Sequence, residues 1–251
     1  MSKKIRILIV IVALIVAGIS GYSILHNYLQ MHAGQAAYDS IREEAIKEPV
    51  VETTPEQKTY NFIDVDFDAL DSINPDINGW LYIHDTPVSY PILRGRDNQT
   101  YLSTTYDRKS NILGSIFQDY RNSADFSDLN TIIYGHNTRN DSMFGSLKKY
   151  KEQEYADSHP EVCVIRKEGV YVYEIFTIYE TPATSDTYTI AFGSNESFAA
   201  YISKMTEQTI VNAAEPPDGE HIITLSTCTG GQKIMRLVLQ AKYIDFVPAK
   251  I

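Results

Sequence analysis

The sequence predicts a mainly β protein, an antiparallel or mixed barrel with peripheral helices, preceded by one N-terminal transmembrane helix. From Trp80 onward, short runs of alternating apolar residues recur between turn residues, a pattern that favours a barrel over alternating strands and helices. The composition, with 18 tyrosines and many β-branched residues, also favours sheet. Residues 7–25 form one uninterrupted apolar run, which predicts the helix in the membrane.

The apolar run at residues 7–25 carries no charge, and at about 1.5 Å per residue it gives a helix of about 28 Å, close to the thickness of the hydrocarbon layer. Basic residues precede it, so the positive-inside rule predicts that residues 1–6 stay in the cytoplasm and that the folded part is extracellular. A cleaved signal peptide, with AGQAA as its cleavage site, is the alternative. Its apolar region would normally span only about 7 to 15 residues, so we expect a single-pass anchor in the cell membrane.

Residues 26–59 are predicted to join the anchor to the folded domain, which we expect at 60–251. The first part of this segment has apolar residues at helical spacing: Tyr38, Ile41 and Ala45. The second part, EPVVETTPEQKT, is polar and contains proline, so we expect a spacer there. The domain then opens with a short helix capped by Asp66, whose inward residues are Phe67, Leu70 and Ile73.

Eight strand-like runs follow: WLYIHD, VSYPILR, GSIFQD, TIIYGH, EVCVIRK, VYVYEIFTIYE, HIITLSTC and IMRLVLQAKYIDFV. Two helices are expected between them. The first covers residues 141–150 and places three residues on one face: Met143, Leu147 and Tyr150. The second follows an N-cap at Ser194 and carries a stripe that suits core packing: Phe198, Tyr201, Ile202 and Met205.

Charge, motifs and cysteine content narrow the function classes. The formal net charge of −10 argues against a nucleic-acid partner, because a phosphate backbone requires a basic face. The chain has no P-loop, HExxH or paired CxxC pattern, so we expect no cofactor and no metal. Cys163 and Cys228 could form a disulfide outside the cell. An exported domain of this size that relied on disulfides would usually carry more cysteines, so a free thiol at Cys228 is favoured.

A cysteine and a histidine at strand ends could carry chemistry. Cys228 ends the run HIITLSTC, shares one strand face with Thr224 and Ser226, and precedes two glycines. Its thiol could line a groove, although a buried core cysteine is the alternative. A nucleophilic thiol needs a partner that accepts its proton. His136 ends the run TIIYGH and enters a loop, which suits a base, unless it is an ordinary surface histidine.

Arg236 is the third candidate. It lies within the apolar run KIMRLVLQ, where a guanidinium is costly unless its donors are satisfied. If the glycines after Cys228 close a hairpin, Arg236 returns beside the cysteine and can stabilise an oxyanion. A structural salt bridge is the alternative. A cysteine, a base and an oxyanion stabiliser together suit acyl transfer. The chain order differs from that of papain-like enzymes, and the caspase signature is absent.

With these residues in place, the sequence resembles the sortases, membrane-anchored cysteine transpeptidases of Gram-positive bacteria, and within them class B. TLSTC, an arginine on the next strand and YGHN upstream carry the resemblance. The other matching motifs, in order, are INGWLYI, YPILRGRDNQTYL, GSIFQDYRNS and MFGSLKKY. The match runs from about Phe67 to Val247, and the helical insert at 194–207 is also similar to class B. The resemblance implies an eight-stranded sortase barrel with peripheral helices.

The resemblance also implies catalytic roles for Cys228, His136 and Arg236. Cys228 would attack the carbonyl of a threonine in a C-terminal sorting signal and form a thioacyl intermediate. His136 would protonate the leaving amine and later deprotonate the incoming one. Arg236 would bind near the oxyanion, with the backbone N–H of Thr229 as a second donor. An amine of the peptidoglycan cross-bridge, or of a lipid-linked precursor, would then resolve the intermediate.

Substrate-binding residues are implied at positions that match class B: Asn98, Leu102, Thr184, Tyr188, Ser226 and Thr229. Two features depart from the class. Thr229 stands where many members have an acidic residue, and the turn from Cys228 to Arg236 is short. The acidic cluster of calcium-dependent members has no counterpart that we can place, so no metal is expected.

The implied partners are secreted proteins bearing a C-terminal sorting signal, a peptidoglycan or lipid-linked amine, and the membrane through the N-terminal helix. Two other functions stay open at this point. One is a pilin polymerase of the same chemistry, with a pilin lysine as the acceptor. The other is a wall-binding module without enzymatic activity.

Overall fold

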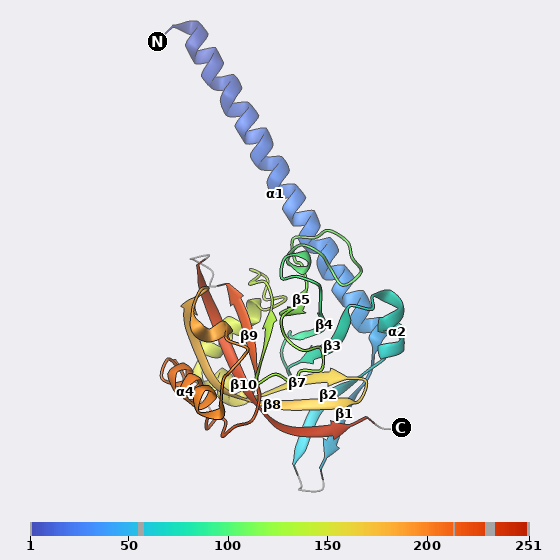
Figure 1. The fold of residues 1–251 in the computed structure, drawn as a ribbon. Coiled ribbons are helices and arrows are strands. Elements are labelled where there is room, and N and C mark those ends of the chain that lie inside the picture. Colours follow the sequence, from blue (N-terminus) through green and yellow to red (C-terminus); the bar gives the residue numbers. More distant parts are fainter. Residues whose placement is uncertain (1, 55–57, 213, 229–233, 250–251) are drawn as a thin grey trace.

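The computed structural model describes residues 2–54, 58–212, 214–228 and 234–249. Its centre is a closed barrel with the strand order β10-β8-β7-β3-β4-β5-β6-β9 (Figure 1). The barrel strands are β3 (Ile77–Tyr82), β4 (Ser89–Leu93), β5 (Ile116–Gln118), β6 (Asn130–Tyr134), β7 (Glu161–Arg166), β8 (Gly169–Pro182), β9 (Ile222–Cys228) and β10 (Met235–Pro248). The predicted eight-stranded barrel is confirmed, and each predicted run overlaps one of these strands.

The barrel is mixed rather than purely antiparallel. Two neighbouring pairs, β4–β5 and β6–β9, run parallel, and the other described neighbours are antiparallel. Parallel neighbours need a long connection, and the chain between β6 and β9 passes through β7, β8 and several helices before it returns. The parallel β6–β9 pair places the C-terminal ends of two strands side by side.

Helices cover the outside of the barrel. The α-helices are α1 (Lys3–Ala45), α2 (Phe67–Ile73), α3 (Gln153–Ser158) and α4 (Asn195–Thr206), and the 3-10 helices are η1 (Thr100–Leu102), η2 (Gly145–Lys151) and η3 (Asp186–Tyr188). Asp66 caps α2 by accepting the backbone N–H groups of Asp68 and Ala69, as predicted. Ser194 caps α4, whose apolar stripe packs on β8 and β10 through Phe176 and Val238. Both helices therefore begin where their sequence signals placed them.

The first helix continues without a break from the predicted membrane segment to the barrel (Figure 1). It has 43 residues, which corresponds to about 65 Å at the rise of an α-helix. By length and composition this helix could cross a membrane. Its apolar side chains between Ile5 and Leu29 are exposed, whereas those of Tyr38, Ile41 and Ala45 are buried against the barrel. The helix that the spacing of these three residues predicted is confirmed.

The segment EPVVETTPEQKT, residues 48–59, was predicted to be a polar spacer, but its first six residues belong to the strand β1 (Ile46–Thr53). β1 pairs antiparallel with β2 (Thr59–Val65), with Val50 opposite Phe62. Phe62 is buried and Val50 packs against the core, so the hairpin has an apolar face despite its charges. The proposed start of the domain at residue 60 thus cuts through a packed hairpin.

The helix predicted for residues 141–150 is shorter than expected. Only η2, from Gly145 onward, is helical, and Leu147 and Tyr150 are buried as predicted. Met143 is buried too, but it lies before the helix with a φ angle of +50°, and Asp141 has a φ angle of +60°. Left-handed backbone cannot continue a right-handed helix, so these residues form a tight loop directly after His136.

Candidate active site

Two parallel strands end together at one end of the barrel. Tyr134 of β6 lies opposite Ser226 of β9, and the Gly135 N–H donates to the Ser226 carbonyl at 3.2 Å. His136 and Cys228 each follow two residues after this pair. Because parallel strands advance in the same direction, their register brings the backbones of these two residues to the same edge. The fold therefore joins the histidine and cysteine segments that the sequence singled out.

Arg236 completes the group from the neighbouring strand. In the antiparallel β9–β10 pair it lies directly opposite Cys228. The two strands thus pair as the hairpin expected from the sequence would. The Arg236 side chain is partly buried, and its Nη1 donates to the Met235 carbonyl at 3.1 Å. The side chain of Cys228 and the whole of Thr229 lie outside the described residues.

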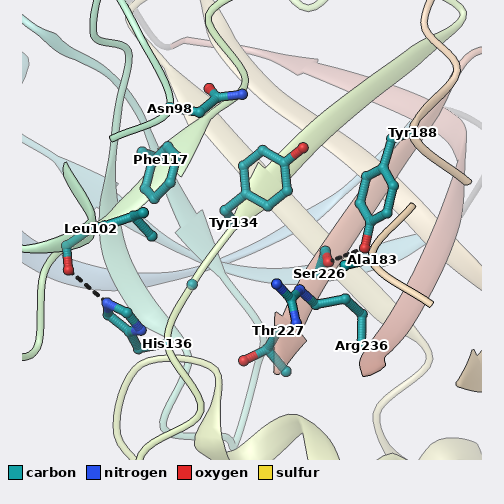
Figure 2. Close-up of a pocket in the computed structure, with 11 residues that line it drawn as sticks. Asn98, Leu102, Phe117, Tyr134, His136, Ala183, Tyr188, Ser226, Thr227 and Arg236 are labelled. Atoms are coloured by element: carbon teal, nitrogen blue, oxygen red, sulfur yellow. Dashed lines mark hydrogen bonds between the residues drawn. The ribbon is translucent and has the colours of Figure 1, made fainter. Parts of the chain in front are cut away.

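A pocket of about 230 Å³ lies beside these strand ends (Figure 2). It is formed by three barrel strands, the first residues of β10 and the loops that follow β4, β6 and β8. Its lining consists of Asn98, Leu102, Phe117, Tyr134, Gly135, His136, Ala183, Tyr188, Ser226, Thr227 and Arg236. The site pocket, as we call this set of residues, thus contains both His136 and Arg236.

Aromatic rings form one wall of the site pocket. The Tyr134 ring lies between two others, with its centroid 5.4 Å from that of Phe117 and 6.1 Å from that of Tyr188. The Tyr188 hydroxyl is hydrogen-bonded to the Ser226 hydroxyl at 2.9 Å, which ties the loop after β8 to β9 (Figure 2). A wall of flat rings with few polar atoms favours an extended, partly apolar ligand.

The His136 ring is oriented by a backbone carbonyl. Its Nε2 lies 2.6 Å from the Leu102 oxygen, at the end of η1 (Figure 2). A carbonyl oxygen can only accept a hydrogen bond, so Nε2 carries the proton in this contact. In the neutral ring, Nδ1 is then the nitrogen that can accept a proton.

A buried carboxylate supports the aromatic wall from behind. The Tyr134 hydroxyl donates to Asp119 Oδ2 at 3.0 Å, and the Arg121 guanidinium donates to both Asp119 oxygens at 2.9 and 2.7 Å. Burial raises the pKa of Asp119, but the hydrogen bonds from Arg121 and Tyr134 outweigh it and hold the pKa below its usual value. Burial and the neighbouring Asp119 raise the pKa of Tyr134, so this hydroxyl stays protonated. The network fixes Tyr134 as a rigid, neutral wall.

Most of the predicted groove residues lie at this pocket. Asn98, Leu102, Tyr188 and Ser226 line it, and Asn98 Oδ1 accepts the Tyr120 N–H at 3.1 Å. Thr184 does not line it: this residue is exposed, and its neighbour Ala183 takes the lining position. The cause is backbone pairing, because the Ala183 N–H donates to the Ile234 carbonyl at 2.7 Å and leaves Thr184 in the turn beyond.

Sequence reasoning missed several lining residues. Phe117 and Tyr134 look like ordinary core residues of alternating strands, and only their position at strand ends beside the motifs could have marked them. By strand alternation, Thr227 would face away from Ser226, yet both line the pocket because β9 ends there. Within the described chain, the buried Thr227 hydroxyl has no hydrogen-bond partner.

The second cysteine is a core residue. Cys163 lies in β7, is buried and is a free thiol, so the disulfide that the composition allowed is not formed. Burial, with a smaller effect of Glu161, raises the pKa of this thiol to about 12. The described residues contain no group of three or more histidine, cysteine or acidic side chains that could hold a metal ion.

Comparisons with known proteins agree with this geometry. The family model described as the sortase domain matches residues 81–244. A Listeria monocytogenes protein named sortase B is 40% identical over 180 residues, which cover 70% of this chain and 72% of the relative. The crystal structure of Staphylococcus aureus sortase B superposes with a TM-score of 0.68 at 30% identity, covering 71% of this chain and 86% of that one. The crystal structure of sortase B from B. anthracis in complex with AAEK1 superposes with a TM-score of 0.74 at 29% identity, covering 87% of this chain and 99% of that one.

Proposed function

Because this chain belongs to the sortase family, with sortase B proteins as its relatives, and is therefore a cysteine transpeptidase, we propose that it attaches secreted proteins to the cell wall. It cleaves a C-terminal sorting signal and joins the new carboxyl end to an amine of the peptidoglycan cross-bridge. The supporting observation is that Arg236 lies opposite Cys228, while His136 follows the neighbouring strand β6 and lines the same pocket as Arg236.

The proposed reaction has two halves. The Cys228 thiolate attacks the carbonyl carbon of a threonine in the sorting signal, and a C–S bond forms as the scissile C–N bond breaks. His136 gives a proton to the leaving amine. The acceptor amine then loses a proton to His136 and attacks the thioester, so that a new amide forms and the thiolate is released. No oxidant is needed, and the acceptor amine is the second substrate.

The environment of each side chain suits its proposed role. Since Nε2 of His136 is held by the Leu102 carbonyl, Nδ1 is the atom that exchanges the proton in this mechanism. The partly buried guanidinium of Arg236 stabilises the oxyanion more strongly than it would in water. The Thr229 N–H is proposed as a second donor. For the sorting signal, we propose Asn98, Leu102, Tyr188 and Ser226 as pocket contacts. Thr229 is proposed as a further contact.

The N-terminal helix is proposed to hold the catalytic site at the outer surface of the membrane. We propose that residues 7–25 cross the membrane, that residues 1–6 are cytoplasmic, and that the catalytic domain is extracellular. In Figure 1, β9 points toward the end of the molecule from which α1 projects. A site on that side meets both emerging secreted proteins and lipid-linked wall precursors at high effective concentration.

A peptide assay tests the proposed nucleophile. The full-length protein in detergent micelles is incubated with a peptide library that has threonine fixed before the scissile bond, together with glycine peptides as acceptors. We expect cleaved and amine-joined products from the wild type and from the control Cys163→Ala, whose thiol is buried. Cys228→Ala should give no product, and His136→Ala and Arg236→Ala should lose about 100-fold or more. Normal turnover by Cys228→Ala would show that the nucleophile is assigned wrongly.

The acceptor separates wall anchoring from pilus assembly. The same chemistry with a pilin lysine would produce ladders of covalently joined subunits when candidate pilins are added. We expect single additions to glycine-type or cross-bridge amines instead. Membership of a transpeptidase family leaves the non-enzymatic wall-binding module without support.

A further inference from the structure

The loop that follows His136 is held in an unfavourable conformation. Two non-glycine residues, Asp141 and Met143, have φ angles of +60° and +50°. The loop closes on itself, because Asn137 pairs with Met143 and the Phe144 N–H donates to the His136 carbonyl at 3.0 Å. Such backbone persists only where the surroundings determine it. The surroundings of Met143 therefore bear on the position of His136.

A buried tyrosine fixes this loop. The Met143 N–H donates to the hydroxyl of Tyr90, which lies in β4 and is 1% exposed. The next residue, Phe144, packs against the residue that precedes His136: a Cβ atom on Gly135 would lie 2.6 Å from the Phe144 ring. Through Met143 and Phe144, the Tyr90 hydroxyl sets the backbone on both sides of the histidine.

The end of α1 holds Tyr90 in turn. The Tyr38 ring meets the Tyr90 ring edge-on, with centroids 5.4 Å apart. The Arg42 guanidinium lies over the same ring, 4.8 Å from its centroid, and Arg42 Nε donates to the Ser89 carbonyl at 2.9 Å. Edge-on aromatic and cation–π contacts restrict a ring without blocking its hydroxyl.

The same tyrosine of α1 fixes the hydrogen-bond partner of His136. The Tyr38 hydroxyl donates to the Gly114 carbonyl at 2.6 Å, and the following Ser115 N–H donates to the Tyr101 carbonyl at 2.8 Å. Gly114 also lies against the backbone of Leu102, so closely that a Cβ atom on Gly114 would be 2.6 Å from the Leu102 oxygen. Tyr38 thereby locates the Leu102 carbonyl that receives His136 Nε2.

From this double connection we propose that Tyr38 and Tyr90 are positioning residues for His136, so that the last turns of the anchor helix are part of the catalytic apparatus. Tyr90 acts on the loop that carries the imidazole, and Tyr38 acts on the carbonyl that orients it. The proposal rests on the role of His136 as general acid and base. It adds that the docking of α1 on the barrel sets the ring geometry needed for that role.

Single hydroxyl deletions in the full-length protein in micelles test the proposal. Tyr90→Phe and Tyr38→Phe keep the rings but remove the bonds to Met143 and Gly114. We expect kcat to fall about five- to ten-fold, the effect of one lost hydrogen bond, while KM stays within about two-fold. The double variant should lose less than the product of the two single effects, because both act on one histidine.

The matched control is Tyr60→Phe. Tyr60 lies in β2 and is 2% exposed, and its hydroxyl donates to Asp245 of β10. Neither residue lines the site pocket. This variant should keep kcat and KM. If it loses kcat as the other two do, general loosening of the fold explains the effect and the proposal is wrong.

Nitrogen NMR of histidine-labelled protein supplies a readout that does not depend on activity. The ring-nitrogen shifts of His136, assigned by their loss in His136→Gln, should move in Tyr90→Phe and Tyr38→Phe but not in Tyr60→Phe. Unchanged shifts together with unchanged kcat would overturn the proposal. An active His136→Ala would instead overturn the proposed function, so the two failures are distinct. If Tyr90→Phe does not fold, Arg42→Gln removes the cation above Tyr90 and should move the same shifts.

Discussion

At the scale of single residues, burial makes the thiol of Cys163 unreactive. Cys163 is buried in β7, and its pKa of about 12 leaves almost no thiolate at neutral pH. We predict that a thiol-reactive probe at pH 8 labels the native protein once, at Cys228, and labels Cys163 only after unfolding. Peptide mapping after labelling checks this. Native labelling of Cys163 at a comparable rate would contradict the burial on which the prediction depends.

The charge of Asp119 supports the wall of the site pocket through its hydrogen bond from Tyr134. The pKa of Asp119 is lower in the folded protein than in the unfolded chain, where it is about 4. Ionised Asp119 therefore stabilises the fold at pH values above the unfolded pKa, and this stabilisation is lost as the pH falls through the folded pKa. Asp119→Asn should destabilise the protein by about 1–3 kcal/mol at pH 7. Thermal unfolding from pH 7 to pH 2 should show the gap to wild type shrinking in acid. A gap that stays constant would exclude this role.

At the scale of elements, the docking of α1 depends on one small residue. A Cβ atom on Gly34 would lie 2.6 Å from Asn111 Oδ1 and 2.7 Å from Leu113 Cδ1, whereas one on Gly21 would meet nothing within 4 Å. Alanine favours a helix by about 1 kcal/mol at either position, so only the contact differs. We expect Gly34→Ala to lower the unfolding temperature of the catalytic domain and Gly21→Ala to leave it unchanged. Equal behaviour of the two variants would mean that the helix does not dock tightly here.

Local patterns predicted most elements, and the failures have a common cause. Alternation and caps located the eight barrel strands and helices α2 and α4. β1 was missed because a proline and several charges hide a strand whose stability comes from its partner β2. Met143 was placed in a helix because its spacing matched, whereas a tertiary hydrogen bond to Tyr90 holds it in a left-handed conformation. Each miss concerns a residue whose conformation is set by a distant segment.

At the scale of the whole molecule, the site could be predicted in outline. Cys228, His136 and Arg236 each break a local pattern, so the sequence alone marks them as candidates. The hairpin register and the parallel β6–β9 pair then bring them to one place. The aromatic wall was not visible, because Phe117 and Tyr134 follow ordinary strand alternation and only the closed barrel shows that they face a pocket.

The extent of the catalytic domain is also a property of the whole molecule. A chain that starts at residue 60 lacks β1 and the buried side chains of Tyr38, Ile41 and Ala45. One that starts at residue 31 keeps them. We predict that the shorter chain is less stable by several kcal/mol, because each large buried side chain contributes about 2–5 kcal/mol. Denaturant unfolding of both checks this, and equal stability would place the boundary at residue 60 after all.

The central claim is that Cys228 carries the acyl group between two amines, and intact-protein mass spectrometry tests it most directly. The protein is mixed with a sorting-signal peptide without an acceptor amine and quenched in acid. We predict an added mass equal to the N-terminal part of the peptide, located at Cys228, released by hydroxylamine and absent from Cys228→Ala. An adduct at another residue, or cleavage with no adduct under any quench time, would contradict the claim.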